Sequence, residues 1–293
     1  MKPRATTMRA ARAREAGLDV GRVIAIANQK GGVGKTTTAI NLAVALAQSG
    51  RRVLLVDLDP QGNATSGLTV VREGETPASA RKTIYDALVV GDALGDVVSE
   101  MRPNLFLAPA GGDLVGAEIE LAMMEGRERR LRALLEAVAL EYNYVLIDSP
   151  PSLGILTLNA LVAADSVLVP MQCEYYALEG LSSLLATVRK VKTALSPGLE
   201  IEGIVLTMFD SRNRLSHEIA REVRQHFADK VFKSVIPRNV RLSESPSHGL
   251  SAIEYDPRSS GAEGYRALAL EIVDRVEGAQ RATENTGGTG HDA

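Results

Sequence analysis

One glycine-rich stretch, Asn28-Gln-Lys-Gly-Gly-Val-Gly-Lys-Thr-Thr37, constrains the fold of this chain more than any other segment. It follows the apolar run 23–27 and precedes apolar residues at helical spacing between positions 39 and 47. The order of apolar run, glycine turn and amphipathic pattern predicts a strand, a phosphate-binding loop and a helix. Further buried runs alternate with helical patterns, so we expect a mostly parallel sheet covered by helices on both faces.

The residue types in this loop fit a polyphosphate. We expect Gly31, Gly32 and Gly34 to adopt φ > 0, so that several N–H groups point into one concavity, where the positive end of the next helix also points. Lys35 would reach the β and γ phosphates, and the hydroxyl of Thr36 would join the shell of a Mg²⁺ ion that keeps several waters. The predicted phosphate site consists of Lys30, Gly31, Gly32, Val33, Gly34, Lys35, Thr36 and Thr37.

The loop departs from the pattern G-x-x-x-x-G-K-[ST] at two positions. Gln29 stands where the first glycine is expected, and a second lysine, Lys30, follows it. One interpretation of Lys30 is a solvated lysine on a loop. The other is a cation that neutralises γ-phosphate charge, including that of a second subunit, so that the nucleotide joins two chains.

Two apolar runs end in aspartates. Run 52–56 ends in Asp57-Leu-Asp59, and strand alternation would place both carboxylates on one side of the sheet. Run 144–147 ends in Asp148, a pattern in which a buried strand delivers a carboxylate to the metal's water shell. One aspartate of the 57/59 pair would hold a Mg²⁺ water and the other the attacking water; the alternative is a helix-capping or solvated pair. Segment 60–67 is predicted to be mobile.

Composition limits the partners and the compartment. The chain has 293 residues, of which 45% are hydrophobic and 24% charged, which suits one α/β domain of about 250 residues plus tails. A single cysteine, Cys173, excludes an internal disulfide and suits a reducing cytosol. No apolar run approaches the roughly 18 residues that span a bilayer. With a net charge of -3, DNA binding would need a local basic patch.

The remaining pattern predicts the other elements. We expect a loop over 70–82, strands over 104–108, 166–170, 201–208 and 231–236, and helices over 83–90, 116–140, 177–194, 216–227 and 262–276. Eight arginines and lysines accumulate between positions 210 and 241, with acidic residues interspersed. Their interpretations are a DNA-facing patch or a solvated surface with ion pairs. The basic residues among 1–20 indicate a DNA or lipid contact, a targeting segment or a solvated tail.

The loop resembles the deviant Walker A motif of the ParA/MinD ATPases, and its residue sequence is most similar to that of the ParA, or Soj, branch. The resemblance extends over 22–276 through Asp57-Leu-Asp-Pro-Gln-Gly-Asn63, Leu146-Ile-Asp-Ser-Pro-Pro-Ser152, Gln172-Cys-Glu-Tyr-Tyr-Ala-Leu-Glu-Gly180 and Ile236-Pro-Arg-Asn-Val-Arg-Leu-Ser-Glu244. It implies a three-layer P-loop NTPase fold, with ATP and Mg²⁺ as cofactors.

The resemblance also implies roles for individual residues. The catalytic residues would be Lys30, Lys35 and Asp59, with Asp59 holding the attacking water. Thr36, Asp57 and Asp148 would serve the metal, and Met208, Pro237 and Asn239 would lie on the adenine side. Arg212 and Arg241 would contact the DNA backbone.

The function implied is ATP-dependent partitioning of a chromosome or plasmid. Mg-ATP would join two subunits, the homodimer would bind double-stranded DNA without sequence preference, and slow hydrolysis stimulated by a ParB-type partner would release it. The protein would be cytoplasmic and nucleoid-associated, without membrane binding. The predicted domains are a basic tail (1–20), the ATPase domain (21–278) and a polar tail (279–293). The rivals are a MinD-like membrane-positioning ATPase and a metabolic ATP-dependent ligase.

Overall fold

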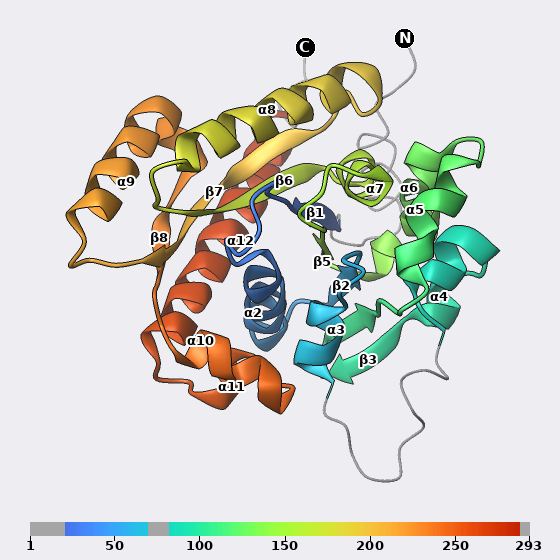
Figure 1. Ribbon diagram of the computed structural model, residues 1–293, viewed down its shortest axis with the longest axis horizontal. Coiled ribbons are helices and arrows are strands. Elements are labelled where there is room, and N and C mark those ends of the chain that lie inside the picture. Colours follow the sequence, from blue (N-terminus) through green and yellow to red (C-terminus); the bar gives the residue numbers. More distant parts are fainter. Residues whose placement is uncertain (1–20, 70–81, 288–293) are drawn as a thin grey trace, which may run out of the picture.

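The computed structural model describes residues 21–69 and 82–287. An eight-stranded sheet runs through it in the order β3-β4-β2-β5-β1-β6-β7-β8, with helices on both faces (Figure 1). Each pair of neighbouring strands is parallel except β3 and β4. The predicted three-layer α/β architecture with a mostly parallel sheet is confirmed.

The strands in the centre of the sheet are short and almost entirely buried. All five residues of β2 and all five of β5 are buried, as expected where helices cover both faces. The strands are β1 (Arg22–Ile26), β2 (Val53–Asp57), β3 (Ser99–Arg102), β4 (Leu105–Ala108), β5 (Tyr144–Asp148), β6 (Ser166–Gln172), β7 (Glu200–Phe209) and β8 (Val231–Pro237).

Two hydrophobic cores separate the sheet from its helix layers. Residues of β1 alternate between them: Val23 and Ala25 belong to one core, and Ile24 and Ile26 to the other. The second core holds α2 (Lys35–Gln48), α3 (Asn63–Leu68), α11 (Ala252–Tyr255) and α12 (Ser260–Gly287). The first holds α4 (Leu94–Val97), α5 (Leu114–Ala122), α6 (Arg130–Val138), α7 (Ile155–Ala163), α8 (Ala177–Ala194) and α9 (Arg214–Phe227).

Parallel pairing brings the carboxyl ends of the central strands to one edge. Asp148, the last residue of β5, is the register partner of Ile26 in β1 and of Asp57 in β2. The phosphate loop follows β1 at the same edge and leads into α2 (Figure 1). This edge is where open α/β sheets place their ligands.

The helix boundaries agree with the sequence prediction for α8 but differ from it for α9 and α12. α8 spans Ala177–Ala194, as predicted. α9 begins at Arg214, earlier than predicted, because Asn213 caps it by accepting the Leu215 N–H (3.0 Å). α12 runs on to Gly287, so the backbone of 279–287 is helical and was not expected to be; this segment contains no proline. The part of the chain that the structure describes contains no helix that could span a membrane.

The segment predicted to be mobile, 60–67, is largely helical. Ala64 and Leu68 of α3 are completely buried, and the Arg102 guanidinium of β3 binds the carbonyls of Leu68 and Gly249. Strand β3 and helix α7 had no sequence prediction. β3 has little apolar alternation and depends on its antiparallel pairing with β4. The predicted loop over 70–82 lies almost wholly outside the described residues.

Candidate nucleotide site

Asn28 fixes the start of the phosphate loop. Its buried side chain donates to the Pro170 carbonyl (2.8 Å), and its Oδ1 accepts the Lys30 N–H (3.0 Å). Gly32 and Gly34 have left-handed φ angles of 74° and 85°. Glycine adopts this conformation without steric cost, and such turns direct successive N–H groups into one concavity.

Gly31 differs from the prediction. Among the described residues, the left-handed glycines of this loop are Gly32 and Gly34, and Gly31 is not one of them. A Cβ built on Gly31 meets no atom within 4 Å. The turn therefore needs positive φ at two positions rather than three.

The end of β7 supports the loop from the side. The Thr207 hydroxyl donates to the Val33 carbonyl (2.8 Å). Met208 Cε lies 3.9 Å from the position that a Cβ on Gly34 would take. Met208 itself has a left-handed φ of 48°, which is uncommon outside glycine. The residue predicted on the adenine side thus lies against the phosphate loop.

Lys35 is buried inside the site. Only 7% of the residue is exposed, and its Nζ donates to the Lys30 carbonyl (3.2 Å). Burial lowers the pKa of Lys35, while the nearby Asp148 and Asp59 carboxylates raise it and so oppose the effect. The buried Lys35 ammonium therefore offers a positive charge to an anion that binds in the phosphate loop. The next two residues, Thr36 and Thr37, lie in the first turn of α2 and are half-buried.

Lys30 points to a different partner. Its ammonium forms an ion pair with Glu174, which follows β6, and the two side chains are 38% and 45% exposed. The lysine is therefore paired at the rim of the site rather than simply solvated. An ion pair between half-exposed side chains contributes little to stability, so a phosphate can replace Glu174 at small cost.

Asp57 is buried beside Asp148 and held by α3. Its Oδ2 accepts the Thr65 N–H (2.8 Å) and the Thr65 hydroxyl (2.7 Å). Burial raises the pKa of Asp57 to about 6, and the hydrogen bonds from Thr65 act in the opposite direction. The carboxyl groups of Asp57 and Asp148 thus lie side by side, buried at the ends of the neighbouring strands β2 and β5.

Asp148 has the acceptor atoms that a hydrated cation would use. Both carboxylate oxygens are buried without a hydrogen-bond partner among the described residues. Burial first, and then the charge of Asp57, raise the pKa of Asp148 well above its ordinary value, and the positive charge of Lys35 opposes this. Orphaned buried oxygens of this kind fit the water shell of Mg²⁺.

The protein side chains do not form a complete metal cage. Among the residues that the structure describes, no group of three or more His, Cys, Asp or Glu side chains is placed to hold an ion. Mg²⁺ commonly keeps several waters and takes oxygens from nucleotide phosphates. The predicted donors Thr36, Asp57 and Asp148 fit that arrangement, in which the ion neutralises phosphate charge.

Asp59 reaches the site by a turn. Strand β2 ends at Asp57, so strand alternation does not place Asp59, contrary to the sequence argument. Instead the Asp59 N–H donates to Asp57 Oδ1 (3.2 Å), and Asp59 Oδ1 accepts the Gln61 N–H (3.0 Å). Asp59 is 7% exposed, and its carboxylate is close enough to Lys35 and Asp148 to influence their pKa values.

Pro237 and Asn239 lie along the same edge of the sheet. Pro237 ends β8 as the register partner of Phe209, the last residue of β7. Asn239 donates to the Ser260 hydroxyl (2.9 Å) and accepts the Arg241 N–H (2.9 Å), which starts α10 (Arg241–Glu244). Pro237 and Asn239 therefore lie at the end of β8, which pairs with β7, the strand that carries Met208; a contact of these residues with adenine stays a prediction.

The two arginines predicted to contact DNA are exposed and paired with carboxylates. Arg212 is 87% exposed and binds Asp210 (3.1 Å). Arg241 is 44% exposed and binds Glu244 (2.8 Å) and Asp256 (3.2 Å). The first follows β7 and the second follows β8, so neighbouring strands deliver both to one edge. Any polyanion there must compete with these acidic side chains.

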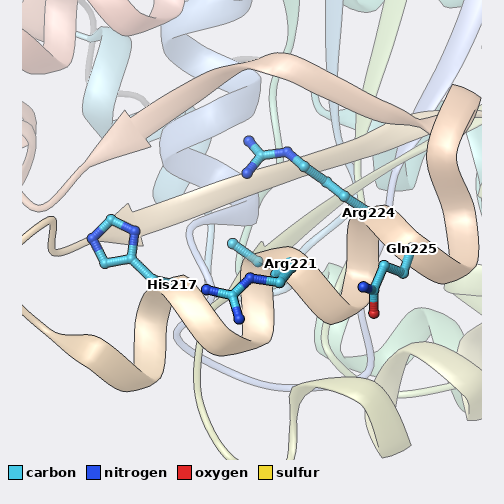
Figure 2. Close-up of a pocket in the computed structure, with 5 residues that line it drawn as sticks. His217, Arg221, Arg224 and Gln225 are labelled. Atoms are coloured by element: carbon cyan, nitrogen blue, oxygen red, sulfur yellow. The ribbon is translucent and has the colours of Figure 1, made fainter.

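A second basic surface lies on α9. A hollow of about 430 Å³ there is lined by His217, Ala220, Arg221, Arg224 and Gln225. Figure 2 shows four of these side chains, labelled, along the helix. Among the described residues, Arg221 and Arg224 have no ion pair, although both are exposed. Their shared helix face agrees with the three-residue spacing in the sequence.

Several residues of the site had no predicted role. Asn28 and Thr207 fix the loop, Glu174 pairs with Lys30, and Thr65 holds Asp57. The sequence offered a signal for Asn28, because an Asn side chain often accepts the N–H two residues later. The contacts of Glu174 and Thr207 join positions far apart in the chain, and Thr65 contacts Asp57 across the turn between β2 and α3, so one sequence contains no signal for them.

The strand, left-handed glycine turn, buried lysine and paired carboxyl groups define a P-loop nucleotide hydrolase. A family model described as an AAA domain, AAA_31, matches residues 21–201. The chain is 56% identical over 255 residues to the sporulation initiation inhibitor protein Soj of Bacillus subtilis, covering 87% of this chain and 99% of that protein. It is 55% identical over 258 residues to the chromosome partitioning protein ParA of Myxococcus xanthus, covering 87% and 89%.

Solved structures share the fold. Cobyrinic acid a,c-diamide synthase from Mycobacterium smegmatis, with an ATP analogue and magnesium, gives a TM-score of 0.76 at 36% identity, covering 89% of this chain and 97% of that one. MinD from Pyrococcus horikoshii, complexed with Mg-ADP, gives 0.72 at 28% identity, covering 88% and 98%. The chain belongs to the ParA/MinD family of ATPases, in its ParA/Soj branch.

Proposed function

We propose that this protein is a DNA-partitioning ATPase that dimerises on Mg-ATP, binds double-stranded DNA without sequence preference and is released by slow hydrolysis. The cargo is a chromosome or a plasmid, and a ParB-type partner stimulates hydrolysis. Relatives at 55% and 56% identity with the names ParA and Soj support this proposal. The protein would act in the cytoplasm on the nucleoid.

One observation carries the proposal: the two loop lysines have different environments. Lys35 is 7% exposed inside its own loop, whereas the Lys30 side chain is 38% exposed at the rim and pairs with the half-exposed Glu174. A cation that is inward-facing serves the nucleotide of its own chain. A cation at the rim can transfer from Glu174 to the γ phosphate of a second subunit, so that ATP joins the two chains.

Dimerisation would make the basic surface adequate for DNA. Arg212 and Arg241 in one subunit offer few phosphate contacts, and their carboxylate partners weaken them. Affinity for duplex DNA grows with the number of phosphates neutralised, so two copies side by side bind far more tightly than one. Contacts to phosphates alone carry no base information, which accounts for binding without sequence preference.

Hydrolysis would use groups that this chain supplies itself. Asp59, held by the turn after β2, orients the attacking water, and Lys35 stabilises charge on the phosphates. Thr36, Asp57 and Asp148 position the ion that neutralises phosphate charge. Loss of the γ phosphate would remove the contact to the partner's lysine and so separate the dimer from DNA.

The decisive experiment measures binding of the purified protein to non-specific duplex DNA at fixed salt with ATP, with ADP and without nucleotide. Binding with ATP alone is the expected result, and Lys30→Ala should abolish it while ATP still binds each monomer. Lys35→Ala should lose nucleotide binding itself. DNA binding that is equal in all three nucleotide states would contradict the proposal.

Two other functions have separate tests. ATP-dependent pelleting with liposomes in the absence of DNA would favour a membrane-positioning ATPase such as MinD. The 36% identity to a diamide synthase supports a ligase as the second candidate. Such an enzyme would hydrolyse ATP only with its acid substrate and ammonia donor, so steady ATP turnover stimulated by DNA and partner would exclude it.

A further inference from the structure

Two adjacent tyrosines are exposed beside the nucleotide site. Tyr175 and Tyr176 are 74% and 67% exposed, and their rings contact each other edge to face, with centroids 5.0 Å apart. They follow Glu174, whose carboxylate pairs with Lys30 of the phosphate loop. Tyrosine is enriched at protein interfaces because its ring is apolar and its hydroxyl polar. The pair therefore indicates an interaction surface at the rim of the nucleotide site.

Contacts between the phosphate loop and α8 show which way Tyr176 faces. The Ser183 hydroxyl of α8 donates to Gln29 Oε1 (3.0 Å), and Gln29 Nε2 donates to the Thr187 hydroxyl (3.4 Å). Tyr176 is the N-cap residue of α8, and its spacing from Ser183 and Thr187 places all three on one helix face. Tyr176 thus lies on the face of α8 that is turned toward the loop carrying Lys30.

The surface next to Tyr176 is open to another molecule. Gly180 lies one helical turn further along the same face, and a Cβ built on it would meet no atom within 4 Å. Ser183, another turn along, is exposed. A second molecule can therefore approach the tyrosines and this part of α8 without displacing a side chain of the described chain.

Transfer of Lys30 to a second subunit would bring that subunit against this surface. Lysine carries its charge on a four-carbon stem, so its ammonium reaches a phosphate of another chain only if that chain lies close to the loop. Glu174, the group that Lys30 would leave, directly precedes Tyr175 and Tyr176. In a twofold dimer both subunits present the same surface, so each tyrosine pair would be covered by the partner.

The phosphate loop alone offers little apolar surface to a dimer. Its one aliphatic residue, Val33, is 1% exposed. Interfaces depend on a few large side chains, Tyr prominent among them, that lose their contact with water. Tyr175 and Tyr176 would supply that contact next to the lysine that crosses between the subunits.

We propose that Tyr175 and Tyr176 form an aromatic anchor of the ATP-dependent dimer and become buried against a second copy of this chain when Lys30 leaves Glu174. The inference rests on the proposed function, because it assigns the surface through which two ATP-bound subunits meet. It adds a contact that does not involve the nucleotide, so the dimer should depend on the two rings as well as on ATP.

Nitration by tetranitromethane measures the accessibility of each tyrosine in the native protein. Peptide mass spectrometry follows the reaction without nucleotide, with Mg-ADP and with a non-hydrolysable ATP analogue and Mg²⁺. We expect Tyr175 and Tyr176 to react in the first two states and to lose most of their reactivity with the analogue. Dilution of the protein should restore the reactivity. Tyr144 and Tyr265, 2% and 1% exposed, are the unreactive references in all states.

Variants test whether the rings hold the dimer. In sedimentation velocity with the analogue, Tyr176→Ser should raise the dimer dissociation constant about tenfold or more, as loss of an interface aromatic commonly does. Tyr176→Phe keeps the ring and should dimerise as the native protein does. Leu270→Ser, at a 61% exposed leucine of α12, is the matched control and should also dimerise normally.

The inference is overturned if the native protein dimerises while both tyrosines stay reactive, or if Tyr176→Ser dimerises normally. Protection that persists on dilution would assign the tyrosines to a change within one subunit and refute it as well. Protection by duplex DNA without nucleotide would assign them to DNA instead. A native protein that stays monomeric with the analogue would contradict the proposed function too, so the two failures are distinguishable.

Discussion

Asp148 is a single residue whose buried carboxyl group destabilises the folded protein when it is ionised. Its two oxygens are buried without partners among the described residues, and its pKa is raised by burial and by Asp57. The ionised form is therefore unfavourable in the nucleotide-free protein. A group whose folded pKa lies above its unfolded pKa binds more protons in the folded state, so stability falls as pH rises between the two values.

The first prediction concerns stability and pH. For Asp57 the window runs from 3.8 to about 6, so the nucleotide-free protein should lose stability as pH rises through it. Asp148→Asn removes the neighbouring charge and should raise the thermal midpoint at pH 7 by about 2–4 °C, equivalent to about 1 kcal/mol. Calorimetry at pH 5 and pH 7 measures this, with the exposed Asp229→Asn as control. A lower midpoint would mean that Asp148 is stabilised as an anion.

The second prediction concerns Asp59. Asp59→Ala should retain ATP and DNA binding but lower the rate of phosphate release about 100-fold or more, since positioning of the attacking nucleophile contributes on that scale. Single-turnover phosphate release and binding of a fluorescent ATP analogue measure the two effects separately. Asp57→Ala is the comparison, because it should weaken Mg²⁺-dependent binding instead. Normal hydrolysis by Asp59→Ala would remove this residue from the mechanism.

At the scale of elements, α3 couples the carboxylate cluster to the rest of the fold. The Thr65 hydroxyl donates to Asp57 (2.7 Å) and accepts the Ala110 N–H (2.9 Å), so one side chain joins α3 to β2 and to the segment after β4. At the end of α3, Arg102 binds the Leu68 carbonyl and also Glu254 of α11 (2.9 Å). These contacts hold a glycine-containing segment in a helix.

The third prediction tests this tether. Thr65→Val keeps the side-chain shape but leaves the Ala110 N–H and the Asp57 carboxylate each short of one partner. It should destabilise the protein by about 1–3 kcal/mol and speed amide hydrogen exchange in α3. Thr65→Ser should restore both values because it retains the hydroxyl. Equal exchange in the valine and serine variants would show that the hydroxyl does not hold the helix.

At the scale of the whole molecule, neighbouring strands bring distant basic residues to one edge. Arg212 and Arg241 are 29 positions apart in sequence, and they follow β7 and β8, whose ends are paired at Phe209 and Pro237. A dimer formed across the nucleotide edge would place both copies of this surface on one molecule of DNA.

The fourth prediction concerns salt dependence. Arg212→Ala and Arg241→Ala should each weaken ATP-dependent DNA binding equally for all sequences. Each lost phosphate contact should reduce the slope of log affinity against log salt by roughly one unit. Fluorescence anisotropy over a salt series measures the slope, with the exposed Arg129→Ala as control. Unchanged slopes in both variants would transfer the DNA contact elsewhere, with Arg221 and Arg224 of α9 as the next residues to test.

The sequence by itself determined the phosphate loop, the strands that end in Asp57 and Asp148, and the bounds of helices such as α8. Each of these depends on local chemistry: glycine at left-handed positions, continuous apolar runs in strands covered on both faces, and apolar residues at helical spacing. Such preferences act over a few neighbouring residues, so they are legible in one chain. The sequence therefore predicted that the phosphate loop and the aspartates 57 and 148 each follow or end a strand, without knowledge of any long-range contact.

Only the tertiary structure decided which distant groups meet. Glu174 is 144 residues from Lys30, and Thr207 is 174 residues from Val33, so no local preference links them. Strand β3 forms because β4 offers a free edge, and α3 is ordered because Arg102 and Asp57 bind it. The exposed face of α5 has the same origin. Both faces of this helix carry apolar side chains, and packing against the core decides which of them remain exposed. These contacts depend on packing between segments that are distant in the sequence, and a local sequence pattern does not predict that packing.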